Sequence, residues 1–354
     1  MKPTGILKDP LFLQHEMGSF HPESPERLHI IYEMLDESRS RLNLEEIASR
    51  EATLEEIGTN HDPRYVTQIA ETAGRPHTYL DPDTSTCAYS WEAAAKAVGG
   101  FFNLVDAVVE GKVRNGFALV RPPGHHAEYR RAMGFCLFNN VALAARYALS
   151  GHGIQRVAIV DWDLHHGNGT QNAFYETDQV LFFSAHQFPH YPGTGRLTDV
   201  GRGKGEGFTV NAPLDRGAGD AEYVTLFHMV VAPIIEAYRP EIILVSAGFD
   251  AHHADPLGGM SLTEDGYELM TQILMHLAQN QCGGKLVMTL EGGYDRGALR
   301  NSVERVLSCL CHYDPKSESV PLEPSLEDLT PSFRSRLQEI VSVQRKYWPN
   351  LPQF

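Results

Sequence analysis

The sequence predicts an α/β fold in which a parallel β-sheet is covered by helices on both faces. Strand-like and helix-like stretches alternate along the chain from about residue 90 onward. The strand-like stretches are continuous apolar runs, which is typical of parallel strands buried on both faces. With 354 residues, of which 42% are hydrophobic and 21% charged, the chain has the composition of a globular protein and can build one large core.

The expected elements follow from the periodicity of the apolar residues. Helices are expected at 90–111, 139–151, 221–238, about 263–280 and about 297–311, and buried strands at 116–122, 156–163, 179–186, 241–250 and 285–294. Pro233 would kink its helix, because proline has no backbone N–H. The segment 186–220 is long and rich in Gly and Pro, so we expect a functional loop there. A last helix at 332–348 is expected to pack on the surface.

Charge and cysteine content narrow the class of protein. The net charge of −15 disfavours nonspecific binding to nucleic acid, which needs a basic surface. An acidic surface could attract cationic substrates, or it could only keep the protein in solution. No apolar stretch has membrane-spanning length, and the N-terminus has no signal-peptide core. The five cysteines show neither a disulfide framework nor a CxxC pair, so we expect a reducing, cytoplasmic location and no thiolate zinc site.

Polar clusters follow four of the predicted strands. They are Arg121–His126, Asp161–Asn168, Phe249–Asp250 and Gly292–Tyr294. Parallel strands place their carboxyl ends along one edge of the sheet, which is where ligands bind in such folds. We therefore expect the four clusters to meet in one crevice.

Two of these clusters predict a metal site. Asp163 and His165 are two residues apart in an extended segment, so their side chains point the same way, and Asp250 adds a ligand from another strand. Catalytic zinc typically has three such protein ligands and one water. A lone Asp-x-His is more often a solvated acidic loop, but the other clusters favour the metal. A binuclear centre of the arginase kind would need carboxylates at Gly167 and Gly248, so one metal is expected.

Between His21 and about residue 311 the chain carries the motifs RPPGHHA, GFCLFNN, DWDLHHGNGTQ, PGTG, SAGFDAH and LEGGY, in this order. By these motifs it resembles the histone deacetylase superfamily, which includes acetylpolyamine amidohydrolases and class II-like bacterial deacetylase-like amidohydrolases. The resemblance implies a single arginase/deacetylase-type domain with an eight-stranded parallel sheet flanked by helices. It places the catalytic domain at 1–313, followed by an extension at 314–354 whose one helix packs on the same domain.

The resemblance also assigns catalytic roles. The implied zinc ligands are Asp163, His165 and Asp250, and the implied catalytic residues are His125, His126, Asp161, Asn168 and Tyr294. His126 would serve as general base and then general acid, with His125 orienting it. Tyr294 would donate a hydrogen bond to the oxyanion of the tetrahedral intermediate. Many members have Asp where this chain has Asn168, and a neutral amide stabilises imidazolium less, so the basicity of His126 should differ.

Monovalent cations, usually potassium, are a further feature of the family. The resemblance implies one structural site at Asp161, Asp163, His165 and Ser184, and a second at the backbone of Phe174, Thr177 and Val180. His166 is expected to be a structural core residue and not a ligand. The choice between zinc and iron(II) stays open at this stage.

The family's acyl-lysine channel gives the expected substrate contacts. Gly134 and Phe135 match one wall, Tyr191 (or His190) the other, and Asp83 matches a rim aspartate. Leu257 and Gly293 are also expected to contact the substrate. One polyamine-selective subgroup has Glu at the position of Leu257, so leucine favours acyl-lysine on a peptide or protein.

The expected function is therefore zinc-dependent hydrolysis of N-acyl amides, most of all acetyl-lysine. The alternatives are an acetylpolyamine deacetylase and a non-catalytic relative that binds acyl ligands. The intact ligand set and Tyr294 speak against the non-catalytic relative. The expected partner is an acylated lysine peptide or protein, or a small acylated amine, without nucleic acid or membrane; a homo-oligomer is left open.

Overall fold

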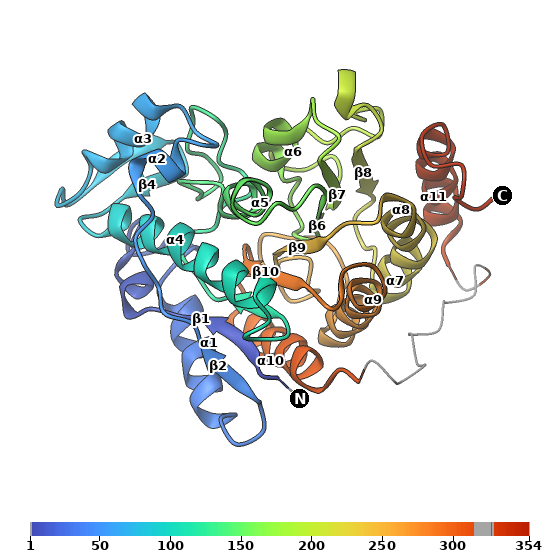
Figure 1. The fold of residues 1–354 in the computed structure, drawn as a ribbon. Coiled ribbons are helices and arrows are strands. Elements are labelled where there is room, and N and C mark those ends of the chain that lie inside the picture. The colour runs from blue at the N-terminus through green and yellow to red at the C-terminus, as the bar shows by residue number, and fades with distance from the viewer. Residues whose placement is uncertain (1, 315–326, 328, 354) are drawn as a thin grey trace.

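The computed structural model describes residues 2–314, 327 and 329–353. Its centre is an eight-stranded sheet in which all neighbouring strands are parallel (Figure 1). Across the sheet the strands are β2 (Leu44–Glu46), β1 (Thr4–Leu7), β5 (Gly116–Ala118), β10 (Leu286–Leu290), β9 (Ile242–Ala247), β6 (Val157–Asp161), β7 (Val180–Gln187) and β8 (Thr209–Leu214). The α/β fold with an eight-stranded parallel sheet is thus confirmed.

The middle strands explain the continuous apolar runs of the sequence. Every residue of β6 and β9 is buried, because both strands have helices above and below them. The two strands pair in register from Val157 with Ile242 to Asp161 with Ser246. This register brings the last residues of both strands to the same edge of the sheet, where the chain leaves the sheet with its polar clusters.

Helices cover both faces of the sheet, as Figure 1 shows. One layer contains α4 (Ser90–Val109), α5 (Asn140–Gly151) and α6 (Asn168–Phe174). The other contains α1 (Glu26–Glu37), α7 (Asp220–Leu226), α8 (Ala232–Tyr238), α9 (Glu264–Cys282) and α10 (Arg296–His312). Side-chain caps start the helices near the predicted positions: Asn139 accepts from the backbone N–H of Ala142, and Asp295 from that of Ala298.

The predicted helix at 221–238 is interrupted in its middle. A π-helical turn at Phe227–Val231 separates α7 from α8, and the backbone N–H of Ala232 bonds the carbonyl of Phe227. Pro233 follows directly and has no backbone N–H to donate to the helical hydrogen bonds. The wider turn lies where the regular helical hydrogen-bond pattern is interrupted. The expected kink therefore takes the form of a π-helical turn.

The prediction of one long loop at 186–220 was wrong in part. It contains β8, the edge strand, which pairs with β7 from Phe182–Thr209 to Gln187–Leu214. Pro213 within β8 has no backbone N–H to donate, which is tolerated only in an edge strand. Because of this proline, the sequence did not predict the strand. Before residue 90 the structure adds α2 (Leu54–Ile57), α3 (Pro63–Ala70) and a hairpin of β3 (Thr78–Asp81) and β4 (Thr84–Thr86).

The last helix, α11 (Pro331–Gln344), lies beside β8 at the rim of the molecule (Figure 1). Trp348 beyond its end is buried, and its indole N–H donates to the carbonyl of Gly207 at 2.9 Å. Residues 315–326, 328 and 354 of the expected extension lie outside the described residues, and the division of the chain at residue 313 remains a prediction.

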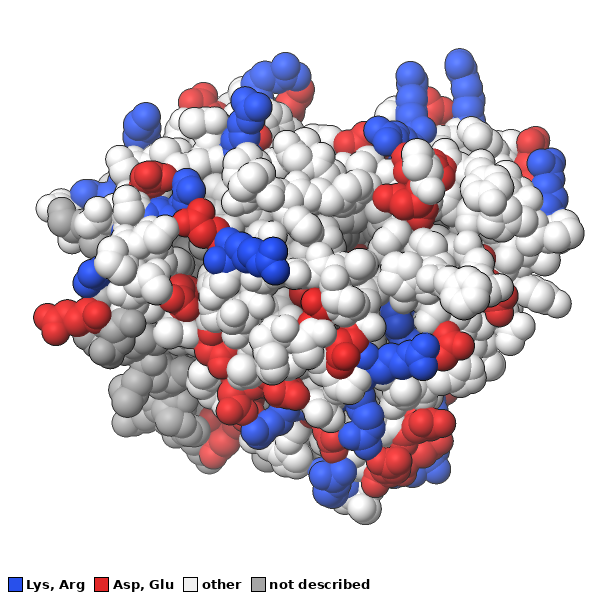
Figure 2. All heavy atoms as spheres, turned by 180° about the vertical axis from the view of Figure 1, so that it is seen from behind, with Lys and Arg blue, Asp and Glu red and all other residues white. Residues whose placement is uncertain are grey.

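The surface carries both signs of charge. On the face opposite that of Figure 1, Lys and Arg side chains alternate with Asp and Glu (Figure 2). Ion pairs such as Arg300 with Glu304 and Arg305 with Glu268 are examples of this mixing. Among the described residues, no helix has the length and apolar character needed to cross a bilayer.

Candidate metal centre and active site

The four polar clusters lie at one edge of the sheet because their strands are neighbours. In the order β5, β10, β9 and β6, these strands precede His125, Tyr294, Asp250 and Asp163 respectively. Parallel neighbours end at the same edge, so residues distant in the sequence come together there. The convergence that the sequence predicts is what the structure contains.

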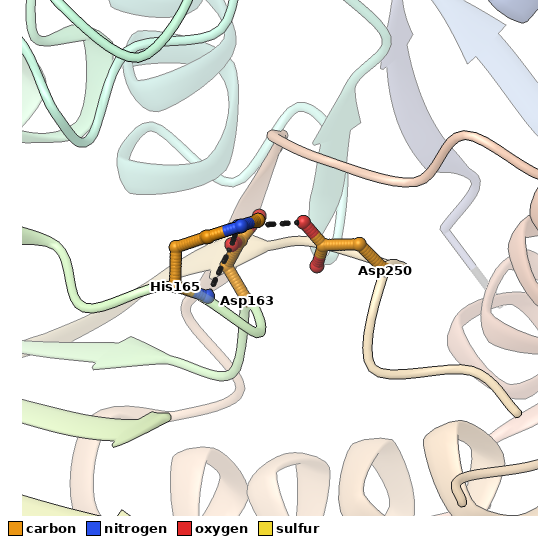
Figure 3. Close-up of side chains that lie close together, drawn as sticks. All are labelled: Asp163, His165 and Asp250. Atoms are coloured by element: carbon orange, nitrogen blue, oxygen red, sulfur yellow. Dashed lines mark hydrogen bonds and ion pairs between the residues drawn. The ribbon is translucent and has the colours of Figure 1, made fainter. Parts of the chain in front are cut away.

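Asp163, His165 and Asp250 form a compact group of possible metal ligands (Figure 3). His165 Nδ1 lies 3.1 Å from Asp163 Oδ1 and 3.0 Å from Asp250 Oδ2. One ligand atom from each residue can be chosen so that all lie within 4.8 Å of one another. Backbone donors hold the two carboxylates, from Gly292 N to Asp163 at 2.8 Å and from Leu164 N to Asp250 at 2.9 Å.

The charges of this group fit a divalent cation. Asp163 and Asp250 are both fully buried, and burying a pair of carboxylates is costly unless a cation lies between them. Burial alone would lower the pKa of His165, but Asp163 and Asp250 outweigh it and raise that pKa to about 10. The position between the three side chains thus strongly favours positive charge, and two carboxylates with one imidazole are a donor set that zinc accepts.

Glycines pack directly against these carboxylates. A Cβ at Gly248 would lie 2.0 Å from Asp163 Oδ2, and a Cβ at Gly167 would lie 2.2 Å from Asp161 Oδ2. These are the two positions at which a binuclear centre would need further carboxylates. Because neither position has room for a side chain while the aspartates stay in place, the geometry supports a mononuclear site.

His125 and His126 lie beside the metal group with ring centroids 4.0 Å apart. His125 Nδ1 is 3.0 Å from Asp161 Oδ2, and His126 Nδ1 is 2.8 Å from Asn168 Oδ1. Burial lowers the pKa of His125, but Asp163 and Asp161 outweigh it and raise that pKa well above its usual value. Burial and the neighbouring charge of His125 hold the pKa of His126 well below its usual value. The pKa values of the two rings are thus shifted in opposite directions, which favours His126 over His125 as a base.

A cavity of about 290 Å³ leads to this group. Its lining comprises Asp83, Pro123, His125, His126, Gly134, Phe135, Cys136, His165, His190, Tyr191, Leu257, Gly292 and Tyr294. It thus brings together the expected Asp83, Gly134, Phe135, Tyr191 and Leu257, and both His190 and Tyr191 take part. Gly293 is not among the lining residues: its carbonyl accepts from Arg27, and its neighbour Gly292 faces the cavity.

The cavity wall at Gly134 requires glycine. Gly134 has a φ of 57°, and a Cβ there would lie 2.3 Å from Cδ2 of His126. The following residue, Phe135, also has a positive φ of 69°, and its ring meets Tyr294 edge-on at 5.8 Å between centroids. Across the cavity, the ring of Tyr191 lies 5.2 Å from that of His126. Aromatic side chains therefore line both sides of the cavity.

Tyr294 has partners that the sequence did not reveal. Its backbone N–H donates to Asp255 Oδ2 at 2.6 Å, and the guanidinium of Arg27 lies 5.0 Å from its ring centroid. Burial raises the pKa of Tyr294 well above its usual value, so its hydroxyl keeps its proton and can donate. Asp255 also accepts from Leu257 N at 2.9 Å. The hydrogen bonds of Asp255 go to backbone N–H groups, which leave no trace in the sequence. The only signal in the sequence was that Asp255 lies five residues after the candidate ligand Asp250.

The residues expected at cation sites occupy two places. Ser184 in β7 pairs with Asp161 in β6, which brings the first group together. Phe174, Thr177 and Val180 surround the turn between α6 and β7, where Thr177 N donates to the carbonyl of Phe174 at 3.3 Å. Both potassium sites remain predictions. The ring nitrogens of His166 lie 2.8 Å from Thr194 Oγ1 and 3.0 Å from Gln171 Oε1.

Comparison with known proteins identifies relatives over nearly the whole chain. Residues 21–310 match the model of the histone deacetylase domain. The chain is 40% identical to Histone deacetylase 15 of Arabidopsis thaliana, over 94% of this chain and 59% of that protein. It is 36% identical to a probable deacetylase of Archaeoglobus fulgidus over 98% of each. The crystal structure of the HDA15 HD domain superposes with a TM-score of 0.90 at 38% identity and covers 98% of this chain and 96% of that chain.

Proposed function

The chain belongs to the histone deacetylase family, and from this premise we propose that it hydrolyses N-acyl amides with one zinc ion. Deacetylation is the activity that family membership supports. The observation that carries the finer proposal is the group of Asp163, His165 and Asp250, of which His165 lines a cavity together with His126 and Tyr294.

Asp163, His165 and Asp250 would hold the metal. A zinc ion bound there would polarise the substrate carbonyl and lower the pKa of a water molecule. The neutral His126, with Nδ1 facing Asn168, presents Nε2 as general base, takes a proton from the attacking water and returns it to the leaving amine.

Two further side chains would assist the reaction. His125, bonded to Asp161, supplies positive charge beside the developing oxyanion. The Tyr294 hydroxyl stays protonated and donates a hydrogen bond to the oxyanion. Zinc is the metal that family membership favours, and iron(II) would fit the same donor set.

The cavity favours an acyl-lysine substrate. Phe135 and Tyr191 provide aromatic walls for an extended aliphatic chain, and Leu257 adds an apolar contact. A free polyamine carries further positive charges, which these apolar side chains do not bind. Asp83 is the acidic group of the lining, and it is the observation that supports the second candidate, an acetylpolyamine deacetylase.

A substrate panel would decide between these candidates. We expect kcat/KM for an acetyl-lysine peptide to exceed that for acetylputrescine, with longer acyl-lysines as the third arm. Equal or better turnover of acetylputrescine would contradict the peptide preference. Removal of the metal by a chelator should abolish turnover, and stoichiometric zinc should restore it.

Tyr294→Phe tests the assignment of the oxyanion donor. We expect kcat to fall about 10²–10³-fold, because one preorganised donor is lost at the developing charge. Metal content, measured by elemental analysis, should stay at that of the wild type. Wild-type turnover by the variant would contradict the role of Tyr294, and a chain that turns over no acyl substrate would support the non-catalytic relative.

Beyond the site, we propose the organisation implied by the family. Potassium would occupy the two cation sites, one at Asp161, Asp163, His165 and Ser184 and one at the backbone of Phe174, Thr177 and Val180. The segment 314–354 would be an extension of the catalytic domain.

A further inference from the structure

The amide of Asn168 contacts a second acidic side chain that has no role in the reaction described above. Asn168 Oδ1 lies 2.8 Å from His126 Nδ1, and on its other side Asn168 Nδ2 donates to Glu128 Oε1 at 2.9 Å. The three side chains form a line from the candidate base to a carboxylate at the edge of the site.

This line matters because an asparagine amide has two different ends. A half-turn of the amide exchanges its acceptor oxygen with its donor NH2 group, at little cost in shape. A carboxylate can only accept, so Glu128 must face the NH2 group, and Oδ1 must then face His126. Oδ1 in turn only accepts, so His126 carries its proton on Nδ1 and leaves the lone pair on Nε2.

The reversed amide would disable the base. Its NH2 group would donate to Nδ1 of His126, and the ring proton would then reside on Nε2, where the reaction needs a lone pair. Asn168 Nδ2 has two other acceptors, the carbonyl of His126 at 3.4 Å and Met133 Sδ at 3.5 Å. Both distances are longer than the 2.9 Å to Glu128, and neither acceptor carries charge.

Glu128 is itself held firmly. Its backbone N–H donates to the carbonyl of Arg131 at 2.9 Å, and its own carbonyl accepts from His61 Nδ1 at 2.9 Å. Its Oε1 also accepts from Asn172 Nδ2 at 3.0 Å. The carboxylate therefore has a fixed place from which it can orient the amide.

We propose that Glu128 is a positioning residue of the hydrolysis, which fixes the orientation of the Asn168 amide and through it the Nδ1–H tautomer of His126. The role rests on the proposed function, because it concerns the base of that reaction. Glu128 does not touch the substrate, so it should affect kcat and leave KM unchanged.

Three variants test the role by kinetics with an acetyl-lysine peptide. Glu128→Ala should lower kcat about tenfold at unchanged KM, a typical effect for an outer residue that orients a site. Glu128→Gln should retain most activity, because its amide oxygen can still accept from Asn168. Asn172→Ala, the matched control, removes the second side-chain donor to Glu128 Oε1 while the backbone contacts of Glu128 remain, and it should leave kcat unchanged. Full activity of Glu128→Ala would overturn the proposal.

Asn168→Asp provides the sharper comparison. Either oxygen of an aspartate can accept from His126, so this variant needs no orienting partner. In the Asn168→Asp background, Glu128→Ala should therefore cause no loss of kcat, because it removes a like charge beside Asp. A tenfold loss in both backgrounds would mean that Glu128 acts on folding or on another group, and would overturn the proposal.

A readout without turnover separates this inference from the proposed function. In ¹⁵N-histidine-labelled protein, the His126 ring signals, assigned by their loss in His126→Ala, should report the Nδ1–H tautomer. Glu128→Ala should add the Nε2–H tautomer, whereas Asn172→Ala should not. An unchanged tautomer in Glu128→Ala would overturn the inference even in an active enzyme. A wild type that turns over no acyl substrate would overturn the proposed function, and the tautomer would still decide the role of Glu128.

Discussion

At the scale of single residues, the candidate metal site depends on glycines that pack against its aspartates. Gly248 and Gly292 lie so close to the aspartates that a Cβ would approach carboxylate oxygens to 2.0 Å and 2.2 Å. The sequence showed Gly248 only as a missing carboxylate of a binuclear centre. The structure adds the spatial reason, which is that the carboxylate of Asp163 occupies the space of that side chain.

Gly248→Ala should therefore impair the metal site. The new methyl group would push Asp163 out of place, and we expect at least about tenfold weaker metal binding, measured by competition with a chromogenic chelator. Gly151→Ala is the matched control, because the nearest atoms to its Cβ would be 3.9 Å away. Unchanged affinity in Gly248→Ala would contradict the geometry of the group.

The sequence identified residues of the site through spacing and motif, and it missed those that act through hydrogen bonds. Asp163, His165 and Asp250 could be found because ligand chemistry demands their types at strand ends. Asp255 and Glu128 could not, because their partners are backbone amides or side chains far along the chain. Such contacts depend on loop conformations that no local pattern specifies.

At the scale of elements, apolar periodicity predicted the buried strands and the long helices and failed at the edges. The strands β6 and β9 are buried on both faces, so their apolar runs were distinct. The edge strand β8 contains Pro213 and lies in a Gly-rich segment, which hid it. Short N-terminal elements such as β2, with three partly exposed residues, gave no pattern.

The packing of the last helix leads to a prediction about stability. Trp348 contacts Phe208 and Tyr238 ring to ring and bonds Gly207, so Trp348→Ala should lower the free energy of unfolding by about 3–5 kcal/mol in urea denaturation. Lys346→Ala, at an exposed position, should change it by less than about 0.5 kcal/mol. Separate unfolding of the C-terminal segment, with the main transition unchanged in Trp348→Ala, would contradict its integration into the domain.

At the scale of the whole molecule, several buried histidines have a lowered pKa. Burial is the main cause that lowers the pKa of His61 and His186 to about 4 and that of His15 to about 3. These pKa values lie below the ordinary 6.5 of an unfolded chain. At these three side chains the unfolded state therefore binds more protons than the folded state in the window between pH 6.5 and about 4.

These three histidines should consequently reduce stability as the pH falls through this window, whereas buried carboxyls with a raised pKa, such as Asp255 and Glu291 at about 7, act in the opposite direction. Each buried histidine contributes up to about 1.4 kcal/mol per pH unit once the pH is below its unfolded value. Urea denaturation at pH 7.5, 6.5, 5.5 and 5.0 would measure the slope. Compared with the wild type, His61→Gln should change the slope by up to about one proton, and an identical pH dependence in the two proteins would contradict the assignment of the His61 ring as neutral.

The two oxygens of Asp255 connect the backbone of two residues that line the cavity. One accepts from the backbone of Tyr294 and the other from that of Leu257, at 2.6 Å and 2.9 Å. A single carboxylate thus supports both the residue that carries the phenol and the leucine. A movement of Leu257 that keeps its hydrogen bond to Asp255 would also disturb the support of Tyr294, so the breadth of accepted substrates and the speed of turnover are coupled in this protein.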